Sequence, residues 1–214
     1  MKAKWILPLF ALLLINHPAF CQNRRVYEGV VSLKQKTIGT LILMEINGSS
    51  ISGWIRLVKF VPIDSGTVAE NSVEFKAAGN TYNVDERKGR ISYSGPDGDG
   101  DRLVTRLTSV TGKLQEIMEG ERFTGGATIA TLDVDGRLKR FSVDEPSLWK
   151  RQGPPFEKFS RVEELLQRTV TFWVSDLDNQ GSVELIEEPE GMDIPLKAPK
   201  KPKEKKDKDK NGKK

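Results

Sequence analysis

Apolar and polar side chains alternate along most of the stretch from Val26 to Val143, and glycines separate the alternating segments. One example is the segment 37–46, in which every second residue belongs to one of two sets. The first set is Ile38, Thr40, Ile42, Met44 and Ile46, and the second is Gly39, Leu41, Leu43 and Glu45. Successive side chains of a strand point to opposite faces, so this period predicts strands and not helices.

Further short segments of this stretch have strand composition, bounded by glycine or polar turn residues. They are Tyr27–Leu33, Val73–Ala77, Thr81–Asp85, Arg90–Ser94, Leu103–Thr108 and Leu114–Glu119. Short strands at near-regular spacing are typical of an antiparallel meander. We therefore predict a mainly β fold in which an antiparallel meander forms a small barrel or, as the alternative, a sandwich.

Two dipeptides carry the strongest turn signals. Asn47-Gly48 separates the segment 37–46 from Ile51–Val58, and Asp135-Gly136 separates Ala127–Val134 from Arg137–Val143. Asn-Gly and Asp-Gly favour the type I′ turn, whose two central residues both have positive φ. Glycines also fall inside the predicted strands, where glycine usually marks a bulge or strong coiling, and this favours a barrel over two flat sheets. They are Gly29, Gly39, Gly53, Gly125 and Gly126.

The pattern changes after about residue 152, where Gly153-Pro154-Pro155 interrupts it. Ser160–Glu163 has the form of a capping box, which predicts a short helix that ends near Arg168. Thr169–Val174 returns to strand composition, and Val183–Glu187 can pair with it as a β-hairpin. We expect a barrel domain over residues 22–152 and, over residues 153–195, a helix and hairpin that pack on the barrel.

Both ends of the chain have their own composition. Residues 1–21 place Lys2 and Lys4 before the apolar run Trp5–Ile15, which suits a signal peptide and is shorter than the ~20 residues of a membrane span. Cleavage after Cys21 predicts an exported protein, periplasmic or secreted; the bulky Phe20 argues against lipidation of Cys21. Residues 196–214 hold ten lysines against three acids and no aromatic residue, so we predict a disordered tail.

Composition excludes several classes of chemistry. The single histidine is His17 and the single cysteine is Cys21, and both lie in the predicted signal peptide. A mature chain without them has no thiol nucleophile, no Ser-His pair and no imidazole or thiolate metal ligand. The formal charge of +4 is also unevenly distributed along the chain. The tail carries +7 and the predicted signal peptide carries +2, so residues 22–195 carry −5. What remains is chemistry by carboxylates, Lys or Tyr, or no chemistry at all, and of these we favour a protein that is not an enzyme.

Two acidic segments are candidate calcium sites. Asp97, Asp99 and Asp101 alternate with glycines, and oxygen ligands at this spacing suit calcium. Pro96 and the two glycines equally predict an ordinary solvated turn, the interpretation that we prefer.

The segment 176–187 resembles an EF-hand loop more closely, with Asp176, Asp178 and Glu187 at positions one, three and twelve. Gln180 replaces the usual acid at position five, and the flanking segments have strand composition where an EF-hand requires helices. The preferred interpretation is a hairpin loop, with Ca²⁺ as the alternative and no other cofactor.

Six aromatic residues could line a cavity inside the barrel or simply fill its core, and the core is the default. They are Trp54, Phe60, Phe75, Tyr82, Trp149 and Trp173.

These features lead to one hypothesis of function and two alternatives. The first is an exported, non-enzymatic β-barrel that binds a ligand or partner, while Lys197–Lys214 contacts an anionic polymer or membrane surface. The tail lysines lack interleaved aromatics, so no specific readout of nucleic acid is expected. The alternatives are a carboxylate-based polysaccharide hydrolase and a calcium-stabilised structural module.

Overall fold

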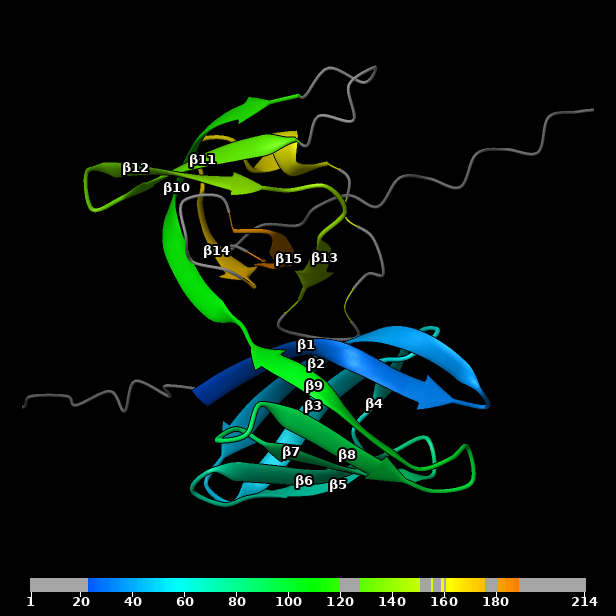
Figure 1. Ribbon diagram of the computed structural model, residues 1–214. Coiled ribbons are helices and arrows are strands. Elements are labelled where there is room, and N and C mark those ends of the chain that lie inside the picture. Colours follow the sequence, from blue (N-terminus) through cyan, green and yellow to red (C-terminus); the bar gives the residue numbers. More distant parts are fainter. Residues whose placement is uncertain are drawn as a thin grey trace, which may run out of the picture.

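The computed structural model describes residues 23–119, 128–150, 155, 159, 161–175 and 181–188. These residues fold mainly as β-strands in two sheets, one below the other in Figure 1. The first sheet contains β1 (Asn23–Leu33), β2 (Lys36–Asn47), β3 (Ser50–Arg56), β4 (Phe60–Pro62), β5 (Ser65–Val68), β6 (Ser72–Ala77), β7 (Asn80–Asp85), β8 (Arg90–Ser94) and β9 (Gly100–Arg106). The second contains β10 (Thr108–Met118), β11 (Ile129–Val134), β12 (Arg137–Ser142), β13 (Ser147–Trp149), β14 (Thr169–Val174) and β15 (Val183–Glu187).

The first sheet closes into an antiparallel barrel of eight strands, and the predicted barrel is thus confirmed. The strand order is β2-β1-β9-β8-β7-β6-β5-β3, and β2 pairs again with β3 to complete the circle. The short strand β4 adds to β3 outside this circle. Closure between β3 and β5 depends on one residue pair, Ser50 with Thr67, whereas β1 and β2 pair along their whole length.

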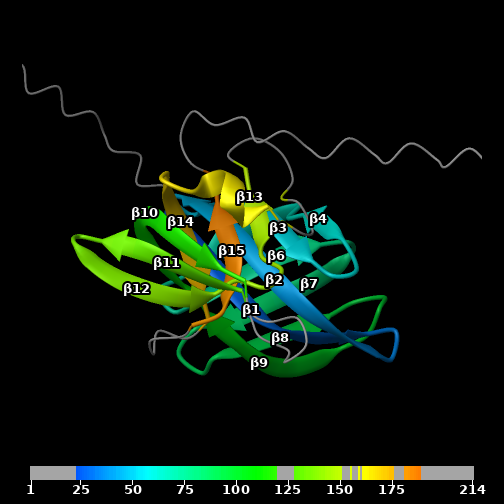
Figure 2. The same cartoon turned by 90° about the horizontal axis from the view of Figure 1, so that it is seen from above.

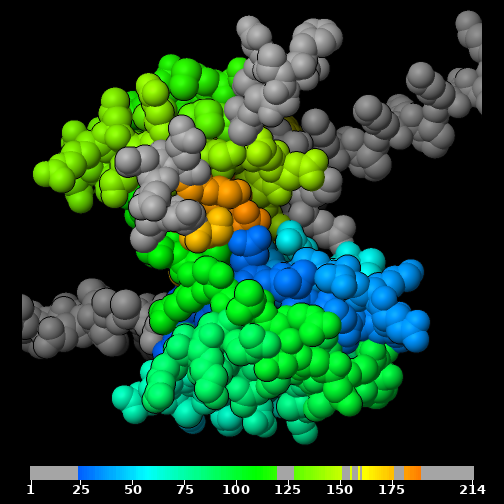
Figure 3. Space-filling model, in the orientation of Figure 1, coloured from blue at the N-terminus to red at the C-terminus, as the bar shows by residue number. Residues whose placement is uncertain are grey.

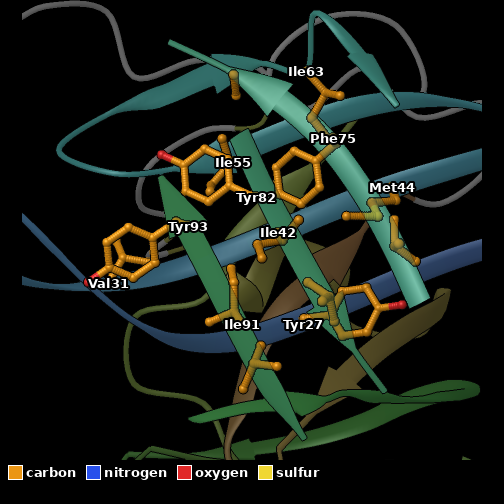
Figure 4. Close-up of a cluster of buried hydrophobic side chains, with 14 of the residues drawn as sticks. Tyr27, Val31, Ile42, Met44, Ile55, Ile63, Phe75, Tyr82, Ile91 and Tyr93 are labelled. Carbon is orange, nitrogen blue, oxygen red and sulfur yellow. The ribbon is translucent and has the colours of Figure 1, made fainter. Parts of the chain in front are cut away.

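The barrel interior is filled by its own side chains. Tyr27, Ile42, Met44, Phe75 and Tyr82 belong to one buried cluster, and Figure 4 shows them converging between the strands. The rings of Phe75 and Tyr82 stack with centroids 5.0 Å apart. The alternation over residues 37–46 has the predicted effect, since one set of side chains enters this core and the other faces outward.

Polar clusters occupy the two ends of the barrel. At one end Glu86 accepts hydrogen bonds from the Tyr27 hydroxyl (2.5 Å), Arg25 (3.1 Å) and Arg106 (3.4 Å). Burial, and then the adjacent Glu86 carboxylate, raise the pKa of Tyr27 well above its ordinary value. These hydrogen bonds satisfy the Tyr27 hydroxyl and the Glu86 carboxylate, whereas the buried Nε of Arg25 has no hydrogen-bond partner among the described residues.

At the opposite end Asp97 accepts hydrogen bonds from Lys34 Nζ (2.9 Å) and Asn80 Nδ2 (3.2 Å). The same two donors lower the pKa of Asp97 below its ordinary value. The nearby Tyr93 hydroxyl accepts a hydrogen bond from the backbone N–H of Ser32 at 2.7 Å. These contacts attach the loop after β8 to the β1–β2 turn.

One predicted turn is confirmed and the other is corrected. Asp135 (φ 52°) and Gly136 (φ 79°) both have positive φ between β11 and β12, as a type I′ turn requires. At the β2–β3 turn, Asn47 instead pairs with Ser50, and the two loop residues are Gly48 and Ser49. Only Gly48 has positive φ (62°), which is the type II′ pattern, with glycine first.

The second sheet has the order β12-β11-β10-β14-β15-β13. Its two faces differ, and the side chains of one face form a separate buried cluster that includes Leu114, Leu132, Phe141 and Phe172. The pairing predicted between the segments 169–174 and 183–187 is confirmed. The sheets divide the chain at Leu107, inside the range 22–152 that the sequence assigns to one barrel domain.

The helix predicted to end near Arg168 is wrong. The described residues contain no α-helix, and this segment forms only a 3₁₀ turn, η1 (Val162–Leu165). Its N-cap is Arg161, which makes no side-chain capping bond, and Ser160 lies outside the described residues. The N–H of Gln167 donates to the Leu114 carbonyl (2.7 Å), so pairing with β10 replaces the next helical hydrogen bond. Among the described residues, no helix is long and apolar enough to cross a membrane.

Candidate functional site at the junction of the two sheets

The outer face of β1, β2 and β3 carries apolar side chains between two polar rows. The register places Arg24 beside Glu45 and Glu45 beside Ser52 in the first row. The second row is Val26, Leu43 and Trp54, and the third is Glu28, Leu41 and Arg56. An apolar strip on the outside of a barrel requires a cover, because leaving it in water is unfavourable.

The second sheet supplies this cover. Trp149 of β13, Trp173 of β14 and Leu185 of β15 pack with Val26 and Leu43 in a buried cluster. Leu41 and Leu107 belong to the same cluster. Figure 3 shows β14 and β15 (yellow to orange) against β1 (blue), and Trp149 and Trp173 lie 6.5 Å apart, centroid to centroid.

Arg24 connects both sheets at one edge of this junction. Its guanidinium forms ion pairs with Glu45 of β2, at 3.0 Å, and with Glu187 of β15. The same group lies over the ring of Trp149, 4.6 Å from its centroid, a cation–π contact. Because its side chain is only 10% exposed, these contacts are less screened by solvent than those of a surface pair.

A cleft of about 260 Å³ opens beside this network. Barrel strands supply most of its lining, and β13 supplies the opposite wall. The lining residues are Glu45, Ser52, Gly53, Trp54, Pro62, Ile63, Trp149 and Lys150. Trp149 is nearly fully buried and Trp54 is half-buried, so one indole forms part of a fixed wall and the other keeps an exposed surface. The cleft therefore combines two aromatic surfaces with one acidic and one basic side chain.

Two carboxyl groups approach each other elsewhere in the junction. Burial raises the pKa of Glu28 on β1, and the negative charge of Glu184 on β15 raises it further, against the opposing effect of Arg56. Glu28 and Glu184 are not among the residues that line the cleft.

The acidic loop places its three carboxylates on different partners. Asp97 is held by Lys34 and Asn80, Asp99 accepts a hydrogen bond from the N–H of Gly95 (3.2 Å), and Asp101 pairs with Arg90 (2.8 Å). Within the described ranges, no group of three or more His, Cys, Asp or Glu side chains is placed to hold a metal ion. The three carboxylates therefore bond to separate neighbours, two of them outside the loop, and calcium binding here stays a prediction.

The second candidate calcium segment is described only in part. Asp176 and Asp178 lie outside the described residues, and Glu187 lies in β15, where it pairs with Arg24. The flanking segments are the strands β14 and β15 and not the two helices of an EF-hand. Calcium binding by residues 176–187 stays a prediction.

The six aromatic residues are distributed over both sides of the barrel wall. Phe75 and Tyr82 lie in the barrel core. Trp149, Trp173 and, at its margin, Phe60 pack in the junction, and Trp54 lines the cleft.

Sequence reasoning did not identify Glu45 or Lys150 as site residues. The register of the β2–β3 hairpin could have identified this part of the surface, because it places Leu41, Leu43 and Trp54 on one outward face.

The chain matches no protein-family model, no curated protein and no solved structure. Its function is therefore inferred from the geometry of the junction.

Proposed function

We propose that the protein is an exported, non-enzymatic binding protein whose ligand occupies the cleft at the junction of the two sheets. The observation that supports this most is the lining of the cleft, in which Trp54 from the barrel and Trp149 from β13 accompany Glu45 and Lys150. Ligand sites in proteins combine apolar walls with a few polar groups that fix orientation, and they occur preferentially where structural units meet.

The cleft suits a small polar ligand with a flat apolar face, such as a single sugar ring. Its volume, about 260 Å³, lies just below the range of roughly 300–1,000 Å³ for drug-sized ligands. An indole offers a rigid apolar surface with one polar atom, and its contact with a ring-shaped ligand restricts few rotatable bonds. Glu45 and Lys150 together offer an acceptor and donors, which match hydroxyl groups.

The lining favours binding over hydrolysis. A carboxylate-based glycoside hydrolase needs two carboxyl groups about 5–10 Å apart across its cleft. Among the described lining residues Glu45 is the one carboxylate, so the lining lacks the second carboxyl group that hydrolysis needs, and Glu45 already forms an ion pair with Arg24.

The predicted tail supports a second part of the proposal, contact with an anionic surface. Residues 22–195 carry a formal charge of −5 and residues 196–214 carry +7. Such a tail would hold the exported protein near an anionic polymer by salt-sensitive, nonspecific attraction.

Native mass spectrometry of the protein purified from its source tests the proposal. The expected result is added mass that corresponds to a small organic ligand. The same measurement on Trp54→Ala should show at least a tenfold loss of occupancy, because the variant removes one wall of the cleft. Val58→Ala is the matched control, since Val58 is 85% exposed and does not line the cleft. A ligand that Trp54→Ala retains in full would place the binding site elsewhere.

A further inference from the structure

The strand β12 is the outermost strand of the second sheet on one side. The sheet begins with β12-β11-β10, and the described residues place no other strand along its outer side. Figures 1 and 2 both show the β11–β12 hairpin at the periphery of the molecule. On that side the described residues form a bridge between Ser142 and Ser182 at the end of the strand.

The turn at Asp135-Gly136 determines which backbone groups point outward. In a two-residue hairpin the flanking residues, here Val134 and Arg137, exchange both hydrogen bonds, and every second pair does the same. The N–H and C=O groups of Leu138, Arg140 and Ser142 therefore point away from β11. Ser142 follows this rule, because its N–H donates to the Gly181 carbonyl at 3.1 Å. Leu138 and Arg140 offer the same pair of groups further along the edge.

The side chains of this edge are basic and exposed. Arg137, Lys139 and Arg140 form no ion pair with any residue that the structure describes. Leu138, between them, is 69% exposed. Arg137 and Lys139 lie on one face of the strand, and Leu138 and Arg140 lie on the other.

The geometry points to β12 as a docking edge for an extended acidic polypeptide, which adds to the sheet as a further strand. Main-chain hydrogen bonds to Leu138 and Arg140 would give affinity, and acidic side chains opposite the three cations would give selectivity. A second copy of this chain is the less favourable occupant, because pairing two β12 edges would bring like charges together. The proposal is independent of the cleft.

A matched pair of variants tests the role of the backbone. Leu138→Pro removes one outward N–H and no hydrogen bond to β11, a position at which an edge strand tolerates proline. Leu138→Ala removes the same side chain and keeps the N–H. The probe is a fluorescent peptide of about six residues, typical of one strand, in which Glu and Val alternate, titrated with the full chain at low salt. We expect Leu138→Pro to weaken binding at least about fivefold relative to Leu138→Ala, the effect of one lost hydrogen bond. Thermal melts of both variants verify that they fold.

A second comparison separates strand addition from attraction to the lysine tail or to the exposed cations alone. The same peptide, N-methylated at alternate residues, keeps its charge but cannot pair with the edge, so it should bind at least fivefold more weakly than the parent peptide. Equal binding of the methylated peptide, or of the parent peptide to both variants, would overturn the proposal in favour of an electrostatic patch. Absence of peptide binding would also overturn it, as would dimerisation that Leu138→Pro abolishes.

Discussion

The barrel and the second sheet are both antiparallel in most of their pairings, but they differ in how far apart the paired strands lie in sequence. Most pairs in the barrel join strands that are neighbours in the sequence, some of them through two-residue turns, as in β1–β2 and β6–β7, while β1–β9 and β3–β5 join strands further apart. The second sheet instead joins β10 to β14 and β13 in parallel to β15. Local turn chemistry therefore specifies most of the barrel, whereas burial of distant segments specifies the second sheet.

The two regions also differ in what their outer faces do. Much of the barrel exterior is exposed, but the strip of Val26, Leu41 and Leu43 is buried completely beneath the second sheet. The barrel core thus consists of side chains from the barrel alone. The second sheet has a core of its own and also contributes side chains to the junction. We expect the barrel to be the more stable of the two.

The largest expected effect is on closure of the barrel, at Gly53. Its φ is +146°, and a Cβ added there would lie 1.9 Å from the carbonyl oxygen of Leu43. Gly53→Ala should lower the free energy of unfolding by at least about 3 kcal/mol, measured by urea denaturation. Gly39→Ala on β2 is the matched control, because an added Cβ there meets nothing within 4 Å. Equal stability of the two variants would contradict the geometry at Gly53.

The junction is tested by Trp149→Ala. Trp149 is only 2% exposed, and its removal should cost about 3 kcal/mol, as for other buried aromatic residues. Because the loss falls between the sheets, calorimetry should show the second sheet unfolding before the barrel. Trp54→Ala, at the half-buried edge of the cleft, should keep a single transition. A single transition in Trp149→Ala would mean that the sheets unfold as one unit even without this contact.

A smaller effect is expected at the β2–β3 turn. Gly48→Val places a β-branched residue at φ +62° and should cost at least about 1 kcal/mol, visible as a lower urea midpoint. Ser49→Val changes the next residue of the same turn, whose φ is not positive, and should change the stability by less than about 0.5 kcal/mol. If both variants unfold at the midpoint of the parent, the turn does not depend on glycine.

The smallest expected effect is a gain in stability at Glu28, in the junction. The pKa of Glu28 is raised above its unfolded value of 4.5, so the folded state binds the proton more tightly and its charged form opposes folding. The penalty is complete at neutral pH and is relieved as the pH falls through the folded-state pKa toward 4.5. Glu28→Gln should therefore stabilise the protein by a few tenths of a kcal/mol at pH 7, and by less near pH 4.

Two controls accompany the Glu28→Gln measurement. Glu184→Gln should reduce the gain from Glu28→Gln, since the Glu184 charge contributes to it. Glu74→Gln, exposed on β6, should change little. A loss of stability in Glu28→Gln at pH 7 would show that an attractive contact of Glu28, such as that with Arg56, outweighs burial and repulsion.

The candidate site could be predicted only in its parts. The alternation over residues 37–46 predicted that successive side chains point to opposite faces of a strand. It did not predict that Leu41 and Leu43 of the outward set are buried by a partner surface. The short helix after residue 160 failed as a prediction, because its apolar residues Val162 and Leu165 are buried by the second sheet in a single turn. A capping pattern describes how a helix can begin, and tertiary contacts decide whether it continues.

The sequence by itself determined the mainly β fold, the positions of most strands and the type I′ turn at Asp135-Gly136, because alternation and turn conformation depend on residues close together in the chain. Only the tertiary structure decided that β10 leaves the barrel to pair with β14, and that Glu45, Trp54 and Trp149 line one cleft. The first arrangement joins residues about 60 positions apart, and the second joins residues about a hundred positions apart. They follow from the burial of apolar surface by whichever distant segment fits it, and no local pattern records that choice.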